Sequence, residues 1–183
     1  SAGWLYRAAG PARHGLVGAR GAGYLREEAG RERVQEETMT IGQIKRIEEI
    51  ETPAAVVELD RMVVNLERMA AYTREHGLAL RPHIKTHKTP ALAAEQLRLG
   101  AVGVTVATPR EAEVMAEVVD DILVAYPPVG GGRIERLLAL PERVRLTVGL
   151  DSSEALRALA SAAHAAGREI GVLIELDLGM RRC

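Results

Sequence analysis

Short apolar runs alternate with helix signals along most of the chain, and this alternation limits the fold more than any other feature of the sequence. Five of these runs predict strands, at residues 79–85, 102–107, 121–126, 143–149 and 170–177. They begin roughly every 20–27 residues, which is typical of strands that alternate with helices. Because crossovers between such strands are right-handed, we expect a parallel sheet whose strands end at one rim.

The segments between the predicted strands carry helix start and stop signals. Thr89-Pro90 and Thr108-Pro109 each place a capping threonine before a proline at the first helical position, and Glu111 completes a capping box. An earlier helix is expected from Asp60, a good N-cap, to Gly77, and it follows a short strand at 54–59. Further helices are expected at 89–100, 108–119, 130–140 and 151–167.

This pattern predicts an α/β fold and leaves two architectures open. About five βα units fit either an open doubly wound sheet or part of a TIM (β/α)8 barrel, which needs eight units and about 250 residues. The chain has 183 residues, no Phe and 3% aromatic residues, so its core must be built from aliphatic side chains. Such a core suits parallel strands that are buried on both faces. An arc of five strands would leave two sheet edges exposed.

Composition and charge argue against several classes of protein. Hydrophobic residues make up 47% of the chain and charged residues 27%, as in an ordinary soluble domain. The net charge of −1 argues against binding to nucleic acid or to an anionic membrane surface. No apolar run approaches the roughly 20 residues needed to cross a bilayer. Cys183 is the single cysteine and cannot form an internal disulfide, so we expect a reducing, cytoplasmic location.

Residues 1–38 differ from the rest of the chain. They are rich in Gly, Ala and Arg and show no sustained helix or strand period. They contain no apolar stretch of the kind found in a secretory signal, and their five glutamates argue against a transit peptide. We expect 1–38 to be an extension, either upstream sequence translated from a wrong start or a disordered tail. The folded part is then expected to cover 39–183.

The stretch Leu80–Lys88 holds the main candidates for chemistry. It ends the first predicted strand of the repeat, just before a helix, where α/β proteins place functional residues. In a strand, Arg81, His83 and Lys85 would share one face. A lysine among cationic neighbours on an inner face holds its proton less tightly, and a neutral amine can attack an aldehyde. The pattern indicates a Schiff-base lysine, although a solvated basic loop is the alternative and Lys88 is a competing lysine.

Other polar residues are weaker candidates. His83 and His87 have the spacing of a metal pair on a helix, but the flanking prolines argue against a helix there. We therefore assign no metal ligand and expect both histidines to pack around the lysine. Tyr126 ends the predicted strand 121–126 and could face the same pocket. Glycines 130–132 could cradle a phosphate, but the start of a helix explains them better.

The motif RPHIKTHK at 81–88 resembles the cofactor-lysine motif of the fold-type III pyridoxal-phosphate enzymes. The resemblance is strongest to the D-threonine aldolase and D-serine dehydratase family, and alanine racemase is a more distant relative. Supporting stretches follow the same order, namely Thr52-Pro53 before VVELD, VATPREAE at 106–113, AYPPVG at 125–130 and ELDLGMRRC at 175–183. The resemblance thus covers about residues 50–183.

The resemblance implies a fold and a cofactor. The fold would be an eight-stranded α/β barrel followed by a mostly β domain, and 39–183 would form the N-terminal part of the barrel. The strand at 54–59 would belong with the β domain. Lys85 would carry pyridoxal 5′-phosphate as a Schiff base, and Arg182 would lie near the ring and phenolic oxygen of the cofactor. The candidates His83, His87 and Tyr126 would complete the cofactor site.

The resemblance also implies an activity. The first interpretation is a lyase for D-β-hydroxy-α-amino acids, most closely a D-threonine aldolase that forms glycine and acetaldehyde. D-serine dehydratase or a racemase of the same fold is the alternative, and a pyridoxal-phosphate-binding fragment without catalysis is a further one. A homodimer and a divalent metal are implied for the full-length enzyme, but no residue of 1–183 can be assigned to the metal. We expect the fragment alone to be inactive, and to aggregate or remain molten.

Overall fold

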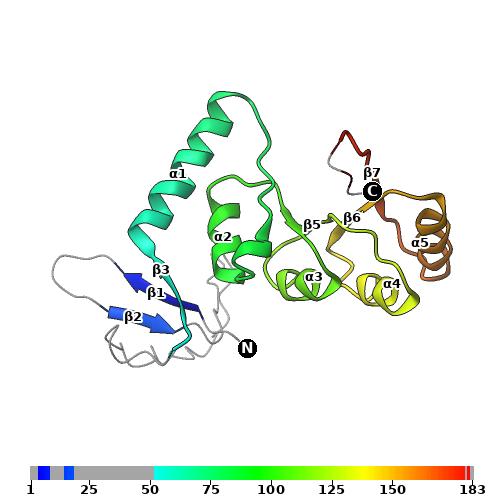
Figure 1. Cartoon of the computed structure of the whole chain (residues 1–183), viewed down its shortest axis with the longest axis horizontal. Helices are drawn as coiled ribbons and strands as arrows, with labels where there is room; N and C mark the ends of the chain where they lie inside the picture. Colours follow the sequence, from blue (N-terminus) through cyan, green and yellow to red (C-terminus); the bar gives the residue numbers. More distant parts are fainter. Residues whose placement is uncertain (1–3, 9–14, 19–51, 180, 182–183) are drawn as a thin grey trace, which may run out of the picture. The chain divides into compact units, whose positions relative to one another are not determined.

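The structure of the chain is a computed structural model that describes residues 4–8, 15–18, 52–179 and 181 (Figure 1). The chain divides into two compact units, residues 1–68 and 69–183. Each unit has its own sheet, of three strands in the first and four strands in the second. Among the described residues, no helix is both long and apolar enough to cross a membrane.

The first unit contains a small mixed sheet. Strand β1 (Trp4–Ala8) pairs antiparallel with β2 (Gly15–Gly18) and parallel with β3 (Ala55–Glu58). Helix α1 (Leu59–Glu75) begins directly after β3. The strand predicted at 54–59 is therefore confirmed, and it lies outside the four-stranded sheet. That it belongs with a β domain stays a prediction.

Strands β1 and β2 lie within residues 1–38, where the sequence shows no sustained helix or strand period. The expectation that 1–38 is an extension, either upstream sequence or a disordered tail, stays a prediction. Trp4 and Tyr6 in β1, and Val17 in β2, belong to residue types that favour strands. Runs of four or five residues are too short to show a sustained period. The domain boundary after residue 38 stays a prediction.

The second unit is built around a parallel sheet in the order β4-β5-β6-β7. Its strands are β4 (Val104–Val106), β5 (Asp121–Val124), β6 (Arg145–Leu150) and β7 (Gly171–Ile174). All neighbouring pairs are parallel. The strand order follows the chain, as in a barrel that is built from successive βα units.

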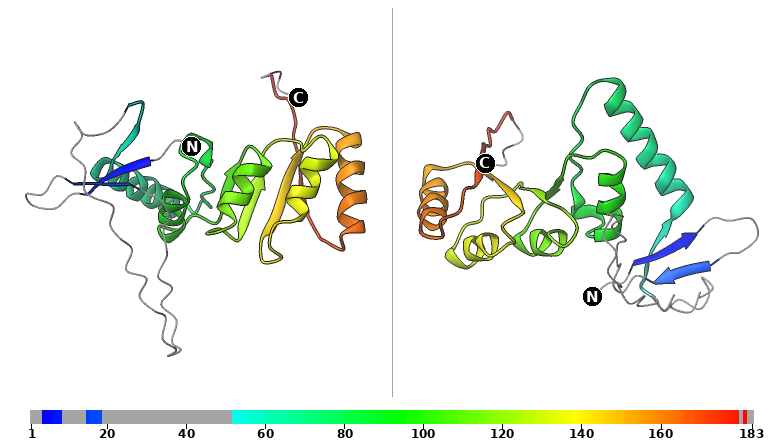
Figure 2. Two further views of the ribbon diagram at one scale, coloured as in Figure 1. Left: turned by 90° about the horizontal axis from the view of Figure 1, so that it is seen from below. Right: turned by 180° about the vertical axis from the view of Figure 1, so that it is seen from behind.

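One helix follows each of the first three strands of this sheet, namely α3 (Pro109–Met115), α4 (Gly131–Leu138) and α5 (Ser153–Ala165). These three helices lie along one side of the sheet (Figures 1 and 2). Helix α2 (Pro90–Arg98) precedes β4. A doubly wound sheet has helices on both faces, whereas the strands of a barrel have them on the outer face only. The arrangement is therefore that of a partial barrel.

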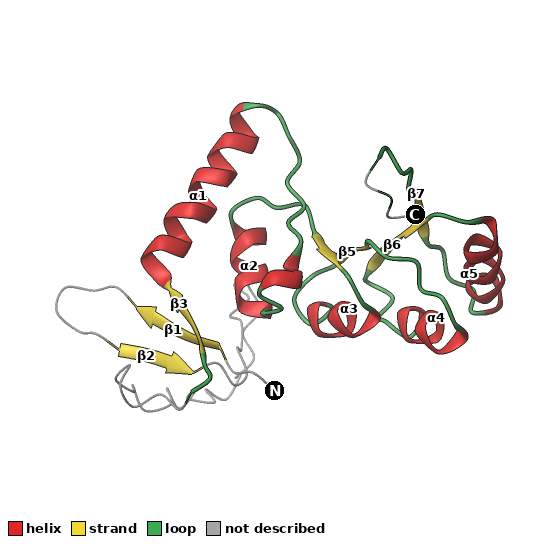
Figure 3. Ribbon diagram, viewed as in Figure 1, coloured by secondary structure: helices red, strands yellow, loops and turns green. Residues whose placement is uncertain are grey.

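The strand predicted at 79–85 is absent. No strand is drawn between α1 and α2 (Figure 3). His83 forms a single bridge with Thr105 of β4, and a 3-10 helix, η2 (Ile84–Thr86), follows at once. The segment nevertheless runs beside β4, because Leu80 and Pro82 accept backbone hydrogen bonds from Val102 and Thr105 at 2.9 and 2.8 Å. Pro82 has no N–H group to continue a hydrogen-bond ladder, which explains why no regular strand forms.

The helix caps follow the sequence signals closely. The Thr108 hydroxyl accepts the N–H of Glu111 at 3.2 Å, and the Ser152 hydroxyl accepts that of Ala155 at 3.3 Å. Thr89 differs, because it forms no side-chain cap for α2. Its hydroxyl donates instead to the carbonyl of His87 at 2.8 Å, which stabilises the turn before the helix.

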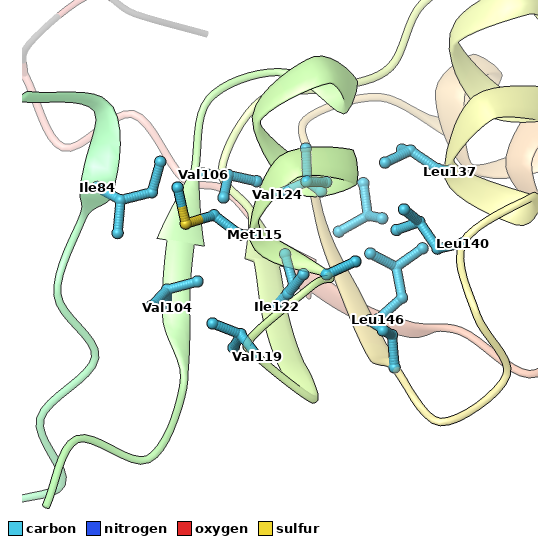
Figure 4. Close-up of a cluster of buried hydrophobic side chains, with 14 of the residues drawn as sticks. Ile84, Val104, Val106, Met115, Val119, Ile122, Val124, Leu137, Leu140 and Leu146 are labelled. Atoms are coloured by element: carbon cyan, nitrogen blue, oxygen red, sulfur yellow. The ribbon is translucent and has the colours of Figure 1, made fainter. Parts of the chain in front are cut away.

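The core lies between the parallel sheet and its helices. It consists of aliphatic side chains and Met115, in keeping with the aliphatic composition of the chain. Ile84 is fully buried at one end of this cluster, next to β4 (Figure 4). Burying such a side chain contributes about 1.5–3 kcal/mol. The core therefore fixes the residue that immediately precedes Lys85.

Candidate functional site

Lys85 is the central residue of η2, beyond the level at which His83 pairs with Thr105. The turn buries Ile84 and leaves Lys85 exposed. Because the segment is not a strand, the alternation of strand side chains does not apply to it, and the position of Lys85 on an inner face stays a prediction. The backbone still carries Lys85 to the end of the sheet at which β4 finishes, which is the rim where we expected it.

His83 lies next to Lys85 in the same turn. Its Nδ1 accepts the backbone N–H of Lys85 at 3.4 Å, which caps η2. Burial and the neighbouring ammonium group of Lys85 lower the pKa of His83, and the carboxylate of Glu111 and a backbone hydrogen bond with Thr105 oppose this. His83 is therefore neutral at pH 7 and lies within electrostatic reach of both Lys85 and Glu111.

Lys88 is not equivalent to Lys85. Its Nζ lies 3.2 Å from Oε1 of Glu111, whose side chain is buried. The other oxygen of Glu111, Oε2, accepts the backbone N–H of Ala107 at 2.7 Å. Among the residues that the structure describes, Lys85 has no such carboxylate partner. The structure thus distinguishes the two lysines that the sequence left in competition.

His87 faces helix α2. Its Nδ1 accepts the N–H of Thr89 at 3.1 Å. Burial lowers the pKa of His87, while Gln96 and the backbone at Thr89 oppose this. His87 Nε2 and Gln96 Oε1 are buried without a hydrogen bond of good geometry to any described residue. The packing of His87 around the lysine stays a prediction.

Tyr126 is exposed and lines a cavity of about 450 Å³ between the ends of β4 and β5 and helices α3 and α4. Arginines 110, 133 and 136 also line this cavity, whereas Lys85, His83 and His87 do not. The structure therefore does not bring Tyr126 into one cavity with the lysine. Its role at the cofactor stays a prediction.

Arg182 lies outside the described residues, and its predicted position beside the cofactor stays a prediction. The turn that precedes Arg182 is partly described. The Asp177 carboxylate accepts the N–H groups of Gly179 and Arg181 at 2.8 and 2.9 Å. Asp177 therefore shapes the turn that precedes Arg182.

A metal site was expected only in the full-length enzyme. Within the described part of the chain, no three His, Cys, Asp or Glu side chains gather in a way that could hold a metal ion. That expectation concerns residues beyond this sequence and stays a prediction.

Sequence reasoning missed the role of two acidic residues near the motif. Glu111 was recognised only as part of a capping box, and Asp121 only as the start of a strand. The capping box was a usable signal for Glu111, because it places a carboxylate beside the end of β4. No local signal identified Asp121, whose partner Arg81 is 40 residues away.

A partial βα barrel with an accessible lysine at the strand-end rim defines the class of this protein. Residues 57–183 match the alanine racemase N-terminal domain family, and the chain belongs to that family. The resemblance inferred from the RPHIKTHK motif is thereby confirmed at the level of the family.

Individual relatives are similar in sequence to most of this chain. A D-threonine aldolase from Arthrobacter sp. is 36% identical over 135 residues, which are 73% of this chain and 36% of the relative. A D-threo-3-hydroxyaspartate dehydratase from Delftia sp. strain HT23 is 40% identical over 130 residues, covering 70% of this chain and 34% of the relative. The chain thus spans about a third of the length of these curated relatives.

Solved structures give the same result. The crystal structure of D-threonine aldolase from Filomicrobium marinum is similar with a TM-score of 0.70 and 41% identity, over 73% of this chain and 37% of that one. The D-threo-3-hydroxyaspartate dehydratase from Delftia sp. HT23 gives a TM-score of 0.64 and 39% identity, over 74% of this chain and 36% of that one.

Proposed function

We propose that this chain is the lysine-bearing part of a pyridoxal 5′-phosphate-dependent lyase for D-β-hydroxy-α-amino acids. The observation that carries the proposal is the difference between the two lysines of the motif. Lys85 is exposed at the rim without a carboxylate partner among the described residues, whereas Lys88 is paired with Glu111. The relatives named as D-threonine aldolase, 3-hydroxy-D-aspartate aldolase and D-threo-3-hydroxyaspartate dehydratase support this substrate class.

The residues around Lys85 fit an aldehyde cofactor. The amine is accessible, and its backbone is fixed by buried Ile84 on one side and by the cap from His83. His83 is neutral at pH 7 and so adds no positive charge beside the amine. Lys85 would hold pyridoxal phosphate through Nζ. When bound, this cofactor stabilises the negative charge that develops on the α carbon of an amino acid.

Further residues are proposed to complete the site. We place Arg182 beside the ring and phenolic oxygen of the cofactor, and His83, His87 and Tyr126 around it. A homodimer, a divalent metal and a cytoplasmic location are proposed for the full-length protein. These assignments rest on the family resemblance.

D-Threonine aldolase is the first candidate among the members of this class. It cleaves the bond between the α and β carbons and forms glycine and acetaldehyde. A dehydratase is the second candidate, because the Delftia dehydratase is 40% identical over 130 residues, close to the values for the aldolases. It would remove the α proton and the β-hydroxyl group and yield a 2-oxo acid and ammonia. A racemase would return the L-amino acid.

Borohydride reduction in the presence of pyridoxal phosphate tests the assignment of Lys85. We expect a reduced covalent adduct on the peptide that contains Lys85. Lys85→Ala should abolish it, and Lys88→Ala is the matched control that should retain it. An adduct on Lys88 alone, or none on either lysine, would contradict the proposal.

Product analysis then separates the candidate activities. The adduct-forming protein is incubated with D-threonine and with D-threo-3-hydroxyaspartate. Glycine identifies an aldolase, ammonia with a 2-oxo acid identifies a dehydratase, and the L-amino acid identifies a racemase. An adduct without any of these products identifies a cofactor-binding protein without catalysis.

A further inference from the structure

Both buried carboxylates among the described residues pair with the motif that carries Lys85. Glu111 and Asp121 are 7% and 8% exposed, and they are the buried acidic residues of this part of the chain. Asp121 accepts from Arg81 at 2.7 Å, and Glu111 pairs with Lys88 at 3.2 Å. The two ion pairs therefore lie on either side of Lys85, at the two ends of the motif.

The ion pair between Arg81 and Asp121 connects the motif to the start of β5. Asp121 begins β5, and its Oδ1 accepts from Arg81 Nη1 while its Oδ2 accepts from Arg145 of β6. Burial would raise the pKa of Asp121, but hydrogen bonds from Arg81 and Arg145 outweigh burial and lower it. Arg81 reaches β5 past Gly103, where a Cβ atom would lie 2.5 Å from its Nη1.

The Lys88 pair holds a strained turn. Lys88 has a φ of +52°, a left-handed conformation that is uncommon for residues other than glycine. Its N–H donates to the carbonyl of Ile84 at 2.7 Å, which closes the turn around Lys85. The contact with Glu111 fixes the far end of this turn to the loop between β4 and α3, since Glu111 also accepts the N–H of Ala107.

The two ion pairs neutralise two of the three basic side chains of the motif. Arg81, Lys85 and Lys88 are its three basic side chains other than histidine. Arg81 and Lys88 are each matched by a buried carboxylate, whereas Lys85 has no carboxylate partner within the described part of the chain. Because Lys85 is in a 3-10 turn and not in a hydrogen-bonded ladder, its position depends on what holds the two ends of that turn.

We propose that Arg81 and Lys88 are positioning residues, whose ion pairs with Asp121 and Glu111 hold the turn that presents Lys85 and set the charge beside its amine. This inference rests on the proposed role of Lys85 as the cofactor lysine. His83 lies within electrostatic reach of both Lys85 and Glu111, and Lys88 is paired with Glu111.

The pH midpoint of adduct formation with pyridoxal phosphate tests the charge part of the proposal. Glu111→Gln removes a carboxylate and leaves the Lys88 ammonium unmatched, so the ammonium form of Lys85 is disfavoured and the midpoint falls. Lys88→Gly removes a cation, suits the positive φ and leaves Glu111 unmatched, so the midpoint rises. We expect shifts of about 0.5–1 pH unit. Lys88→Arg keeps the charge and should stay within about 0.2 unit.

Opposite shifts from the two members of one ion pair are the diagnostic result, because loss of structure alone would move both variants in one direction. Equal shifts, or none, in a protein that still forms the Lys85 adduct would overturn this inference and leave the proposed function intact. Absence of the adduct in the unaltered protein would overturn both. If Glu111→Gln fails to fold, the pH midpoint of Lys88→Gly is compared with that of Lys88→Arg. A higher midpoint for Lys88→Gly supports the inference, and equal midpoints overturn it.

Arg81→Gln tests the positioning part. Arg81 is level with Gly103, away from the amine, so the midpoint should move little. The rate of adduct formation at saturating pH should fall about tenfold, because the turn loses one of its two fixed ends. Arg157→Gln, at an exposed arginine on α5, is the matched control and should leave the rate unchanged. An Arg81→Gln rate equal to that of the unaltered protein would overturn the assignment of Arg81.

Discussion

Arg136 of α4 donates two hydrogen bonds to the Glu113 carboxylate of α3, at 2.6 and 2.7 Å. The two residues are 23 positions apart, in successive βα units. The guanidinium of Arg136, helped by that of Arg110, lowers the pKa of Glu113 to about 2. The pair therefore joins neighbouring helices on the outer side of the sheet.

Glu113 makes stability depend on pH in the acid range. Its pKa is lowered on folding from 4.5 to about 2, so its contribution is present above pH 4.5 and is lost as the pH falls toward 2. We expect the melting temperature of unaltered protein to fall through this window more steeply than that of Glu113→Gln. Thermal melts between pH 2 and 6 measure the difference. Parallel curves would show that the pair does not contribute, as many exposed ion pairs do not.

Gly103 should not tolerate a side chain. A Cβ atom there would lie 2.5 Å from both Arg81 Nη1 and the Asp121 carbonyl oxygen, and the second of these is backbone and cannot move aside easily. We expect Gly103→Ala to destabilise the protein by about 1–3 kcal/mol. Gly149→Ala is the matched control, since its nearest neighbour would be 3.6 Å away. Denaturant titration of both variants gives the comparison, and equal midpoints would contradict the close approach of Arg81.

Ile84 links the core to the candidate site. It is fully buried, so Ile84→Ala should cost about 2–5 kcal/mol through lost burial and a residual cavity. The adduct on Lys85 should also form more slowly, because the turn loses its buried contact. Leu78→Ala, at a residue that is 56% exposed, is the control and should change neither quantity. A destabilised Ile84→Ala protein with an unchanged rate of adduct formation would show that core packing does not position the lysine.

The edge strand β7 should promote self-association. It pairs only with β6 among the described strands, and its residues Leu173 and Ile174 are exposed. An exposed apolar edge is a template for pairing with another chain. We expect Ile174→Lys to reduce aggregation of the 183-residue chain. Leu156→Lys on α5 places the same charge away from the edge and is the control. Light scattering that falls equally for both variants would contradict a specific effect of the edge.

The sequence alone predicted the order of elements and the lysine. Apolar runs followed by caps such as Thr108 with Glu111 gave the succession of strands and helices, because these signals depend on residues a few positions apart. The RPHIKTHK resemblance identified the family and selected Lys85. The prediction of a strand at 79–85 was wrong, because it gave the apolar run more weight than the missing N–H group of Pro82.

Tertiary structure decided which charges meet. Arg81 and Asp121 are 40 residues apart, and their contact depends on the alignment of a segment beside β4 with the start of β5. The same is true of Lys88 and Glu111, whose pairing distinguishes Lys88 from Lys85, a lysine without a carboxylate partner among the residues described. Local patterns determine what each segment becomes, whereas the register between segments determines which side chains share a buried environment. Only the packed sheet fixes that register, so the sequence could point to Lys85 as a candidate but not to the buried carboxylates that pair with Arg81 and Lys88.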